Sequence, residues 1–340
     1  MDRKDIKCLG LLSGGLDSNI AVKLMVKLGY DVTVLNFMSP FCNCTTKQAD
    51  SCKSAAHRIA EEMGLPIKTL FMGEEYISML RAPKHGFGQG LNPCVDCRVM
   101  MFTQTKKVME EMGAKFIFTG EVLSQRPMSQ KRDRLAIIER ESGLKGLIVR
   151  PLSAALLEPT IPEKEGWINR EEMLAISGRS RKPQVEVGRG LGIEEEHLCS
   201  SGGCMLTDRQ FAHKMRDLLD HSTDTTVKEA RILRVGRHFR VSDTAKVIVG
   251  RNNGENEKLL KMLQGDDAVI WVKDHKGPCV VIQGAHENGV TVTACMIAAR
   301  YSDAPAGEEV DVEVGSAAGG EKSVIRVRAI SEEQLEKMRM

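Results

Sequence analysis

Two glycines, two serines and an aspartate near the amino terminus form the segment best suited to chemistry. It reads Leu11-Leu12-Ser13-Gly14-Gly15-Leu16-Asp17-Ser18 and lies between a short apolar run and a run with helical spacing. Glycines permit a sharp turn, and the helix that follows directs its N-terminal N–H groups at the same point. The serine hydroxyls add donors, and the aspartate can hold Mg²⁺. The segment therefore predicts a pyrophosphate cradle, the alternative being an ordinary glycine turn with a capped helix.

A pair of cysteines, Cys94 and Cys97, forms the second chemical segment. Asn92 and Pro93 precede the pair and end any earlier element, so the thiols are expected at the start of a helix. Thiols at a helix N-terminus are expected to have a lowered pKa. Two thiols at this spacing can meet one centre or each other, or can be buried core groups.

Further cysteines offer candidates for the same centre. Cys204 follows Gly202 and Gly203, which permit a close backbone approach, and the nearby Cys199 is the alternative. The spacing of Cys42, Cys44 and Cys52 matches no zinc site, and these three thiols are left unexplained.

Alternating apolar runs indicate the elements that position these segments. Strands are expected at residues 9–12, 31–36, 67–71 and 116–119, and helices at residues 20–28, 55–63 and 100–112. Such alternation predicts an α/β domain with a parallel sheet, whose ligands bind beyond the carboxyl ends of the strands. Ser13, Phe37 and Gly120 fall at those ends.

The pattern changes near residue 225. Strands are expected at residues 231–241, 246–252, 268–272 and 279–283, with a helix starting at residue 255 and a helix or strand at residues 292–301. Cys279 and Cys295 lie in apolar runs and are expected in the core. These features predict a smaller α+β domain.

The overall composition excludes several classes of protein. The chain has 340 residues, 42% hydrophobic and 28% charged, without an apolar run long enough to span a membrane. The charged first residues argue against a signal peptide, and ten cysteines in a chain of this length favour reduced thiols, so a cytoplasmic location is expected.

A net charge of +2 means that nucleic-acid binding must depend on local patches. Candidate phosphate-backbone contacts in two basic loops are Arg126, Arg179, Arg181 and Lys182, although a solvated basic face is the default for such clusters.

The string SGGLDS resembles the PP-loop of the ATP-pyrophosphatase superfamily, whose members cleave ATP between the α- and β-phosphates. The following Asn-Pro-Cys-x-x-Cys resembles the tRNA 2-thiouridylases. These resemblances imply ATP and Mg²⁺ as cofactors and Asp17, Cys97 and Cys204 as catalytic residues. They imply nucleotide contacts from Ser13, Gly14, Gly15, Leu16, Asp17, Ser18, Phe37 and Gly120.

With cysteine at both positions of the pair and a third cysteine further on, the chain resembles the iron–sulfur-dependent branch of these enzymes. That resemblance implies a [4Fe-4S] cluster on Cys94, Cys97 and Cys204, with the fourth iron open to sulfide. The alternative is persulfide and disulfide chemistry on Cys97 and Cys204. No rhodanese-like domain is readable, so a separate sulfur donor is expected.

The strings GRHFRV, IVGRNNGENEKL and GPCVVIQG resemble the RNA-binding domain of NFACT proteins. The resemblance implies phosphate-facing roles for Arg237, His238, Arg240 and Arg251. The expected organisation is a PP-loop domain at residues 1–155, a connecting region at residues 156–224 and an RNA-binding domain at residues 225–340.

Together these resemblances imply an ATP-dependent thiolation of tRNA or another structured RNA, with a homodimer possible and no membrane partner. A PP-loop enzyme that acts on a small-molecule cofactor is one alternative. A non-catalytic RNA-binding factor is the other.

Overall fold

The computed structural model describes residues 2–42, 55–193, 203–265, 267–319 and 321–340. The chain divides into two compact units, Met1–Thr207 and Asp208–Met340. The C-terminal unit thus begins before residue 225, because helix α8 (Arg209–His221) belongs to it.

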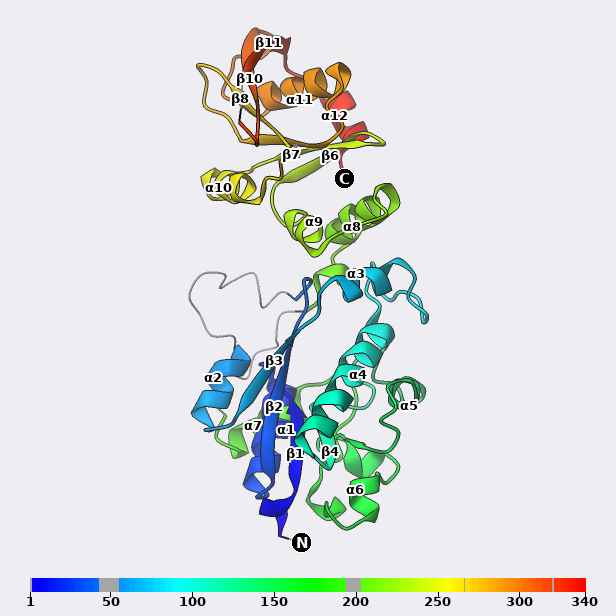
Figure 1. The fold of residues 1–340 in the computed structure, drawn as a ribbon. Coiled ribbons are helices and arrows are strands. Elements are labelled where there is room, and N and C mark those ends of the chain that lie inside the picture. Colours follow the sequence, from blue (N-terminus) through cyan, green and yellow to red (C-terminus); the bar gives the residue numbers. More distant parts are fainter. Residues whose placement is uncertain (1, 43–54, 194–202, 266, 320) are drawn as a thin grey trace. The chain divides into compact units, whose positions relative to one another are not determined.

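A five-stranded sheet forms the centre of the N-terminal unit (Figure 1). Its order is β3-β2-β1-β4-β5, and every pairing is parallel. The strands are β1 (Lys7–Leu11), β2 (Asp31–Met38), β3 (Ile67–Phe71), β4 (Phe116–Thr119) and β5 (Ile148–Val149). The predicted parallel α/β domain is confirmed, with β1 at the middle of the sheet.

Helices cover both faces of this sheet. One buried cluster includes Ile20 and Ile59, and a second on the other face includes Phe102 and Ile138. The helices are α1 (Leu16–Lys27), α2 (Ala55–Glu62), α3 (Glu74–Arg81), α4 (Cys94–Met112), α5 (Arg132–Glu141), α6 (Ile161–Lys164) and α7 (Lys182–Gly190). Strands buried on both faces explain the continuous apolar runs in the sequence.

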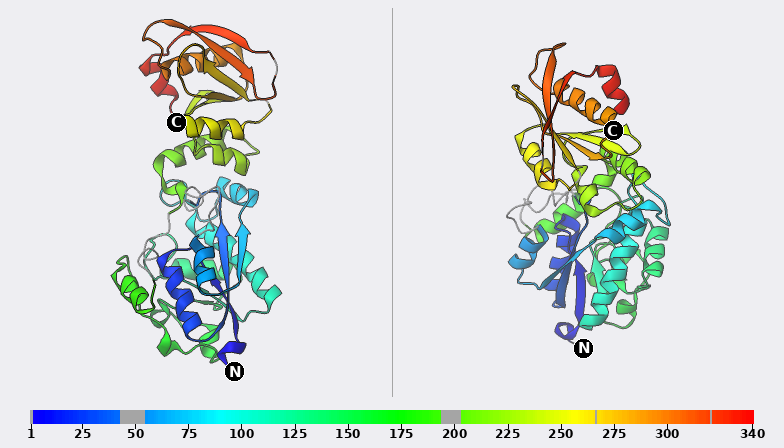
Figure 2. Two further views of the ribbon diagram at one scale, coloured as in Figure 1. Left: turned by 90° about the vertical axis from the view of Figure 1, so that its left-hand side faces the viewer. Right: turned by 45° about the horizontal axis from the view of Figure 1, so that its top comes forward.

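The C-terminal unit is built on a six-stranded antiparallel sheet of order β11-β10-β8-β9-β7-β6 (Figure 2). Its strands are β6 (Arg237–Ser242), β7 (Ala245–Val249), β8 (Ala268–Val272), β9 (Val280–Gly284), β10 (Glu309–Ser316) and β11 (Ser323–Arg328). Besides α8, its helices are α9 (Val227–Ile232), α10 (Asn253–Met262), α11 (Asn288–Arg300) and α12 (Glu332–Met338). This is the expected α+β domain, and residues 292–300 lie in a helix.

Two expectations for the C-terminal unit were wrong or incomplete. Arg231 and Ile232 end helix α9 instead of starting a strand, because a capping box of Thr226 and Glu229 fixes that helix. Strands β10 and β11 were not predicted, although Val310 and Val312 alternate there with charged residues. Cys279 and Cys295 are fully buried, as expected.

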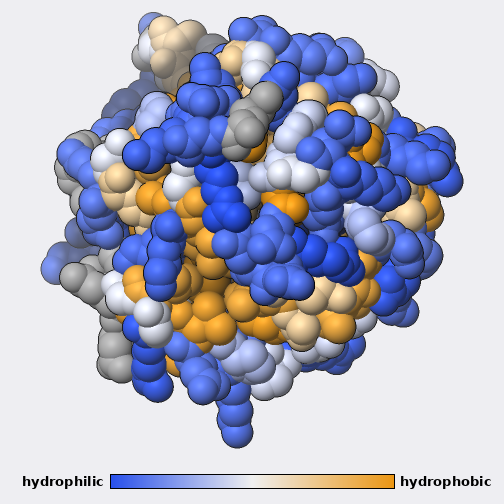
Figure 3. Space-filling model, turned by 90° about the horizontal axis from the view of Figure 1, so that it is seen from below, coloured by the Kyte–Doolittle hydropathy of each residue, from blue (hydrophilic) through white to orange (hydrophobic). Residues whose placement is uncertain are grey.

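Hydrophilic residues cover most of the face shown in Figure 3, with an apolar area among them. Across the described ranges, no helix has both the length and the apolar character needed to cross a membrane.

Candidate functional site

The glycine-serine segment connects β1 to α1 as a tight loop. Its shape is fixed by Ser18, whose Oγ accepts a hydrogen bond from the Ser13 N–H at 3.2 Å and donates one to the Gly15 carbonyl at 2.9 Å. Gly14 has a φ of +80°, which favours glycine. The N-cap residue of α1 is Gly15, which has no side chain that could accept hydrogen bonds from the first N–H groups of the helix. The loop can therefore bind an anion.

Asp17 lies in the first turn of α1, beside this loop. Burial raises the pKa of its carboxyl, while a hydrogen bond from Gln125 and the charges of Arg181 and Arg126 oppose that rise. Its Oδ1 atom is buried and has no hydrogen-bond partner in the described part of the chain. A buried carboxylate oxygen without a donor fits a hard cation such as Mg²⁺.

Gly120 brings the loop after β4 against the same turn. A Cβ atom at this position would lie 2.4 Å from the backbone carbonyl of Asp17 and from the Ser18 nitrogen. Only glycine fits such an approach without a backbone shift. The contact places residues 121–130 beside the loop at residues 13–18.

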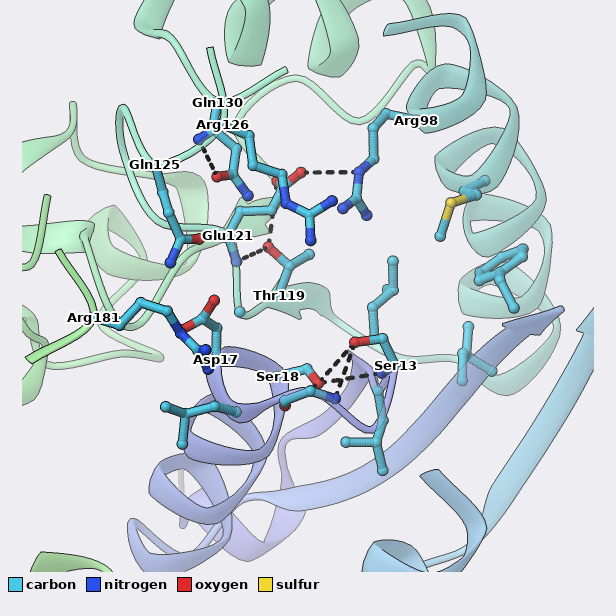
Figure 4. A pocket seen from close by; sticks show the side chains of 18 of the residues that line it. Ser13, Asp17, Ser18, Arg98, Thr119, Glu121, Gln125, Arg126, Gln130 and Arg181 are labelled. Carbon is cyan, nitrogen blue, oxygen red and sulfur yellow. Dashed lines mark hydrogen bonds and ion pairs between the residues drawn. The ribbon is translucent and has the colours of Figure 1, made fainter. Parts of the chain in front are cut away.

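These segments enclose a cavity of about 260 Å³ at the carboxyl ends of the strands (Figure 4). Most of the expected nucleotide contacts line it, as do three of the four arginines and lysines expected in basic loops. These are Ser13, Gly15, Leu16, Asp17, Ser18, Phe37, Gly120, Arg126, Arg179 and Arg181. Gly14 and Lys182 are not among its lining residues. The arginines are thus positioned towards the cavity that was assigned to the nucleotide.

Two lining residues that sequence reasoning missed are Arg98 and Glu121. Glu121 is 3% exposed, and its Oε2 atom accepts a hydrogen bond from Arg150 Nε at 3.1 Å. Its Oε1 atom lies 3.5 Å from Arg98 Nε. Arg150 also forms an ion pair with Glu139, which fixes the Arg150 side chain and thereby the buried carboxylate of Glu121 that it contacts. Arg98 directly follows Cys97 in the sequence, which is the one signal that could have identified it.

The cysteines come together on three chain segments next to the cavity. Cys42 and Cys204 lie opposite each other in an isolated antiparallel β-bridge, and Met205 N–H donates to the Phe41 carbonyl at 2.9 Å. Cys97 shares a hydrogen bond with the hydroxyl of Tyr76, a residue that is 1% exposed. Cys42, which the sequence left unexplained, therefore joins the expected thiols. Cys44, Cys52 and Cys199 lie outside the described residues.

Burial controls the ionisation of these thiols. Burial raises the pKa of Cys97 to about 11 and that of Cys204 to about 12, and it also raises the pKa of Cys94. The positive charge of Arg98 partly offsets the increase in the pKa of Cys94 and Cys97. For Cys204, the neighbouring thiols raise the pKa further. The expected lowering at the helix N-terminus is therefore wrong for the metal-free protein, because desolvation outweighs the helix dipole.

No three His, Cys, Asp or Glu side chains within the described residues are placed to share one metal ion. A four-iron cluster makes a different demand, because each thiolate binds a different iron and the ligands lie further apart. Buried thiols on converging segments have the donor chemistry for such a cluster.

The arginines assigned to RNA in the C-terminal unit have partners within that unit. The Arg237 guanidinium lies 5.0 Å from the Tyr301 ring centroid, and Arg240 forms a paired contact with Asp217. Arg251 donates to the Gly236 carbonyl at 2.9 Å. His238 is 1% exposed, so the expectation that it faces phosphate is wrong.

We expect Gly120→Ala to weaken ATP binding at least about tenfold, because the added methyl group must push the loop away from Asp17. Gly190→Ala is the matched control, since nothing lies within 4 Å of a Cβ atom there. Titration with a fluorescent ATP analogue measures both variants, and unchanged affinity in Gly120→Ala would contradict this geometry.

We expect Cys97 and Cys204 to react slowly with iodoacetamide in the native, metal-free protein. The thiolate is the nucleophile, and burial raises the pKa of Cys97 to about 11 and that of Cys204 to about 12, so between pH 7.5 and 9 both thiols should react much more slowly than the same thiols in unfolded protein. Peptide mass spectrometry at each pH measures the two rates, with urea-unfolded protein as the control. Equal rates in native and unfolded protein at pH 7.5 would contradict the role of burial.

Comparison with known proteins connects both units to families. Residues 4–158 match the family described as thiamine biosynthesis protein (ThiI), and residues 236–339 match the NFACT protein RNA binding domain. A tRNA-specific 2-thiouridylase from Deinococcus radiodurans is 28% identical over 130 residues, which are 35% of this chain and 34% of that protein. A tRNA sulfurtransferase from Desulfurococcus amylolyticus is 26% identical over 146 residues, 43% of this chain and 29% of that protein.

The chain thus spans about a third of the length of these curated relatives. A solved complex of a 4-thiouridine synthetase with RNA and bound ATP is 20% identical with a TM-score of 0.38, covering 66% of this chain and 53% of that one. The family matches show that residues 4–158 are similar to the ThiI family and that residues 236–339 of the same chain are similar to the NFACT RNA binding domain.

Proposed function

We propose that the protein is an ATP-dependent enzyme that thiolates a base of tRNA. The observation that carries the proposal is the start of α4. There Cys94 and Cys97 lie near Cys42 and Cys204, and these four residues form the thiol cluster. The next residue, Arg98, lines the cavity beside the PP-loop. In this proposal a nucleotide site and a sulfur site would adjoin on one helix. The NFACT-type domain supports RNA as the substrate.

The reaction has two steps. A base carbonyl oxygen, such as that of uridine, attacks the α-phosphorus of ATP, the bond to the bridging oxygen breaks, and pyrophosphate leaves. Hydrosulfide, or an equivalent sulfur nucleophile from a separate donor, then adds to the activated carbon, and AMP departs with the former carbonyl oxygen. One oxygen is replaced by one sulfur, and no net oxidation occurs.

The loop at residues 13–18 would bind the departing pyrophosphate through its backbone N–H groups and the start of α1. Its serine hydroxyls are already positioned by hydrogen bonds to each other and to the backbone, so little reorganisation is required. Asp17 would hold Mg²⁺, which neutralises charge on the leaving phosphates when bound. These contacts act on the charge that develops in the first step.

The thiol cluster would serve the second step. Cys94, Cys97 and Cys204 are the proposed ligands of a [4Fe-4S] cluster, which when bound supplies an iron position for the incoming sulfur.

We expect Asp17→Asn to abolish AMP and pyrophosphate formation in the presence of bulk tRNA, because the neutral amide binds Mg²⁺ poorly. Asp133→Asn, an exposed acid on α5, is the control and should retain full activity. AMP is measured by chromatography. Undiminished AMP formation in Asp17→Asn would remove this loop from the mechanism.

We expect anaerobically purified protein to contain about four irons and about four acid-labile sulfides per chain. Cys94→Ala, Cys97→Ala and Cys204→Ala should each lose them, whereas Cys295→Ala, in the C-terminal core, should not. Iron-free wild type would contradict the cluster and favour persulfide chemistry on Cys97 and Cys204.

A further inference from the structure

The cavity beside the PP-loop contains more positive charge than its own acids neutralise. Four arginines and two acids are the charged residues among the described residues that line it: Asp17, Arg98, Glu121, Arg126, Arg179 and Arg181. Glu121 is already engaged by Arg150 from behind. An anion of more than one negative charge therefore fits this cavity.

Two of these arginines, Arg98 and Arg126, approach each other directly. Their guanidinium groups point into the cavity from different elements, Arg98 from α4 and Arg126 from the loop after β4 (Figure 4). Burial and the charge of Arg98 both lower the pKa of Arg126. Two cations placed together in a partly enclosed cavity repel each other, and an anion between them removes that cost.

The contacts of both side chains leave their donors available. In the described part of the chain, the Arg126 guanidinium has neither an ion pair nor a hydrogen bond, although its backbone N–H donates to Gln130 at 2.9 Å. Arg98 Nε lies 3.5 Å from Glu121 Oε1, and among the described residues the two terminal nitrogens of Arg98 form no hydrogen bond, so they can contact a ligand. A planar guanidinium with free terminal N–H groups binds two oxygens of a phosphate at once.

The position of the pair indicates which phosphate it would bind. The loop at residues 13–18 lies at one side of the cavity, as the pyrophosphate cradle, while Arg98 is adjacent to Cys97 on the side of the thiols. The α-phosphate is the group that joins the nucleotide to the acceptor carbonyl. It must therefore lie between the cradle and the sulfur site.

We propose that Arg98 and Arg126 form a clamp for the phosphate of an adenylate, the group shared by ATP, the adenylated acceptor and AMP. This inference rests on the proposed adenylation and assigns two phosphate-binding residues to it. By holding the same phosphate before and after pyrophosphate leaves, the clamp keeps the activated carbon beside the thiols. Glu121, fixed by Arg150, positions Arg98 for this contact.

The test is binding without turnover, with AMP and inorganic pyrophosphate competing separately against a fluorescent ATP analogue. We expect Arg98→Met and Arg126→Met to weaken AMP binding about tenfold or more, because each loses charge-assisted hydrogen bonds, and to change pyrophosphate binding less than about threefold. Arg98→Lys should lie between wild type and Arg98→Met, because it keeps the charge and loses the planar fork. Arg140→Met, an exposed arginine of α5, is the charge-matched control.

Several outcomes would overturn the clamp. If AMP binding and pyrophosphate binding weaken equally, the arginines act only through their general positive charge. If AMP binding is unchanged, Arg98 serves only as the ion-pair partner of Glu121. Loss of bulk tRNA binding in a filter assay, with AMP binding intact, would assign the arginines to the nucleic-acid backbone. Wild type that binds no adenine nucleotide would remove the site altogether.

The clamp and the reaction can fail separately. If AMP binding depends on both arginines and no thiolated RNA forms, the clamp stands and only the proposed reaction is contradicted.

Discussion

The close backbone contact between Gly120 and the first turn of α1 is the constraint on which the site depends. A side chain at Gly120 would lie 2.4 Å from the backbone of Asp17, so the loop after β4 can approach the PP-loop only because that residue is glycine. This approach brings Glu121 and Arg126 over the cavity. The order of the sheet, with β1 between β2 and β4, places both loops at neighbouring strand ends.

The start of α4 links the cavity beside residues 13–18 to the thiols. Cys97 and Arg98 are adjacent in the sequence. The Cys97 side chain lies in the thiol cluster, and the Arg98 side chain lines the cavity. The β-bridge between Cys42 and Cys204 adds two more segments to this cluster. Burial raises the pKa of Cys94, Cys97 and Cys204, so these thiols hold their protons more tightly than an ordinary cysteine does.

The sequence predicted the parts of the structure that are coded locally. Apolar runs located β1 to β4, and the glycines before Asp17 located the tight loop between β1 and α1. The place of Cys42 could not be predicted, because its bridge to Cys204 is a tertiary contact between residues far apart in the chain. Strands β10 and β11 were missed although β10 carries a local strand signal, the alternation of Val310 and Val312 with charged residues; Asp311 of β10 pairs across the strands with Arg326 at 2.7 Å. The pKa of Cys97 was misjudged because the helix position is local, whereas its burial depends on the whole fold.

The most direct test of RNA thiolation is mass spectrometry of nucleosides from tRNA. Unmodified tRNA is incubated anaerobically with the purified protein, ATP, Mg²⁺ and sulfide, and is then digested. A nucleoside in which one sulfur replaces one oxygen, formed with wild type and absent with Asp17→Asn or without ATP, is the expected result. Release of AMP without any thionucleoside, from protein that contains its full iron and sulfide, would contradict thiolation of tRNA as the function.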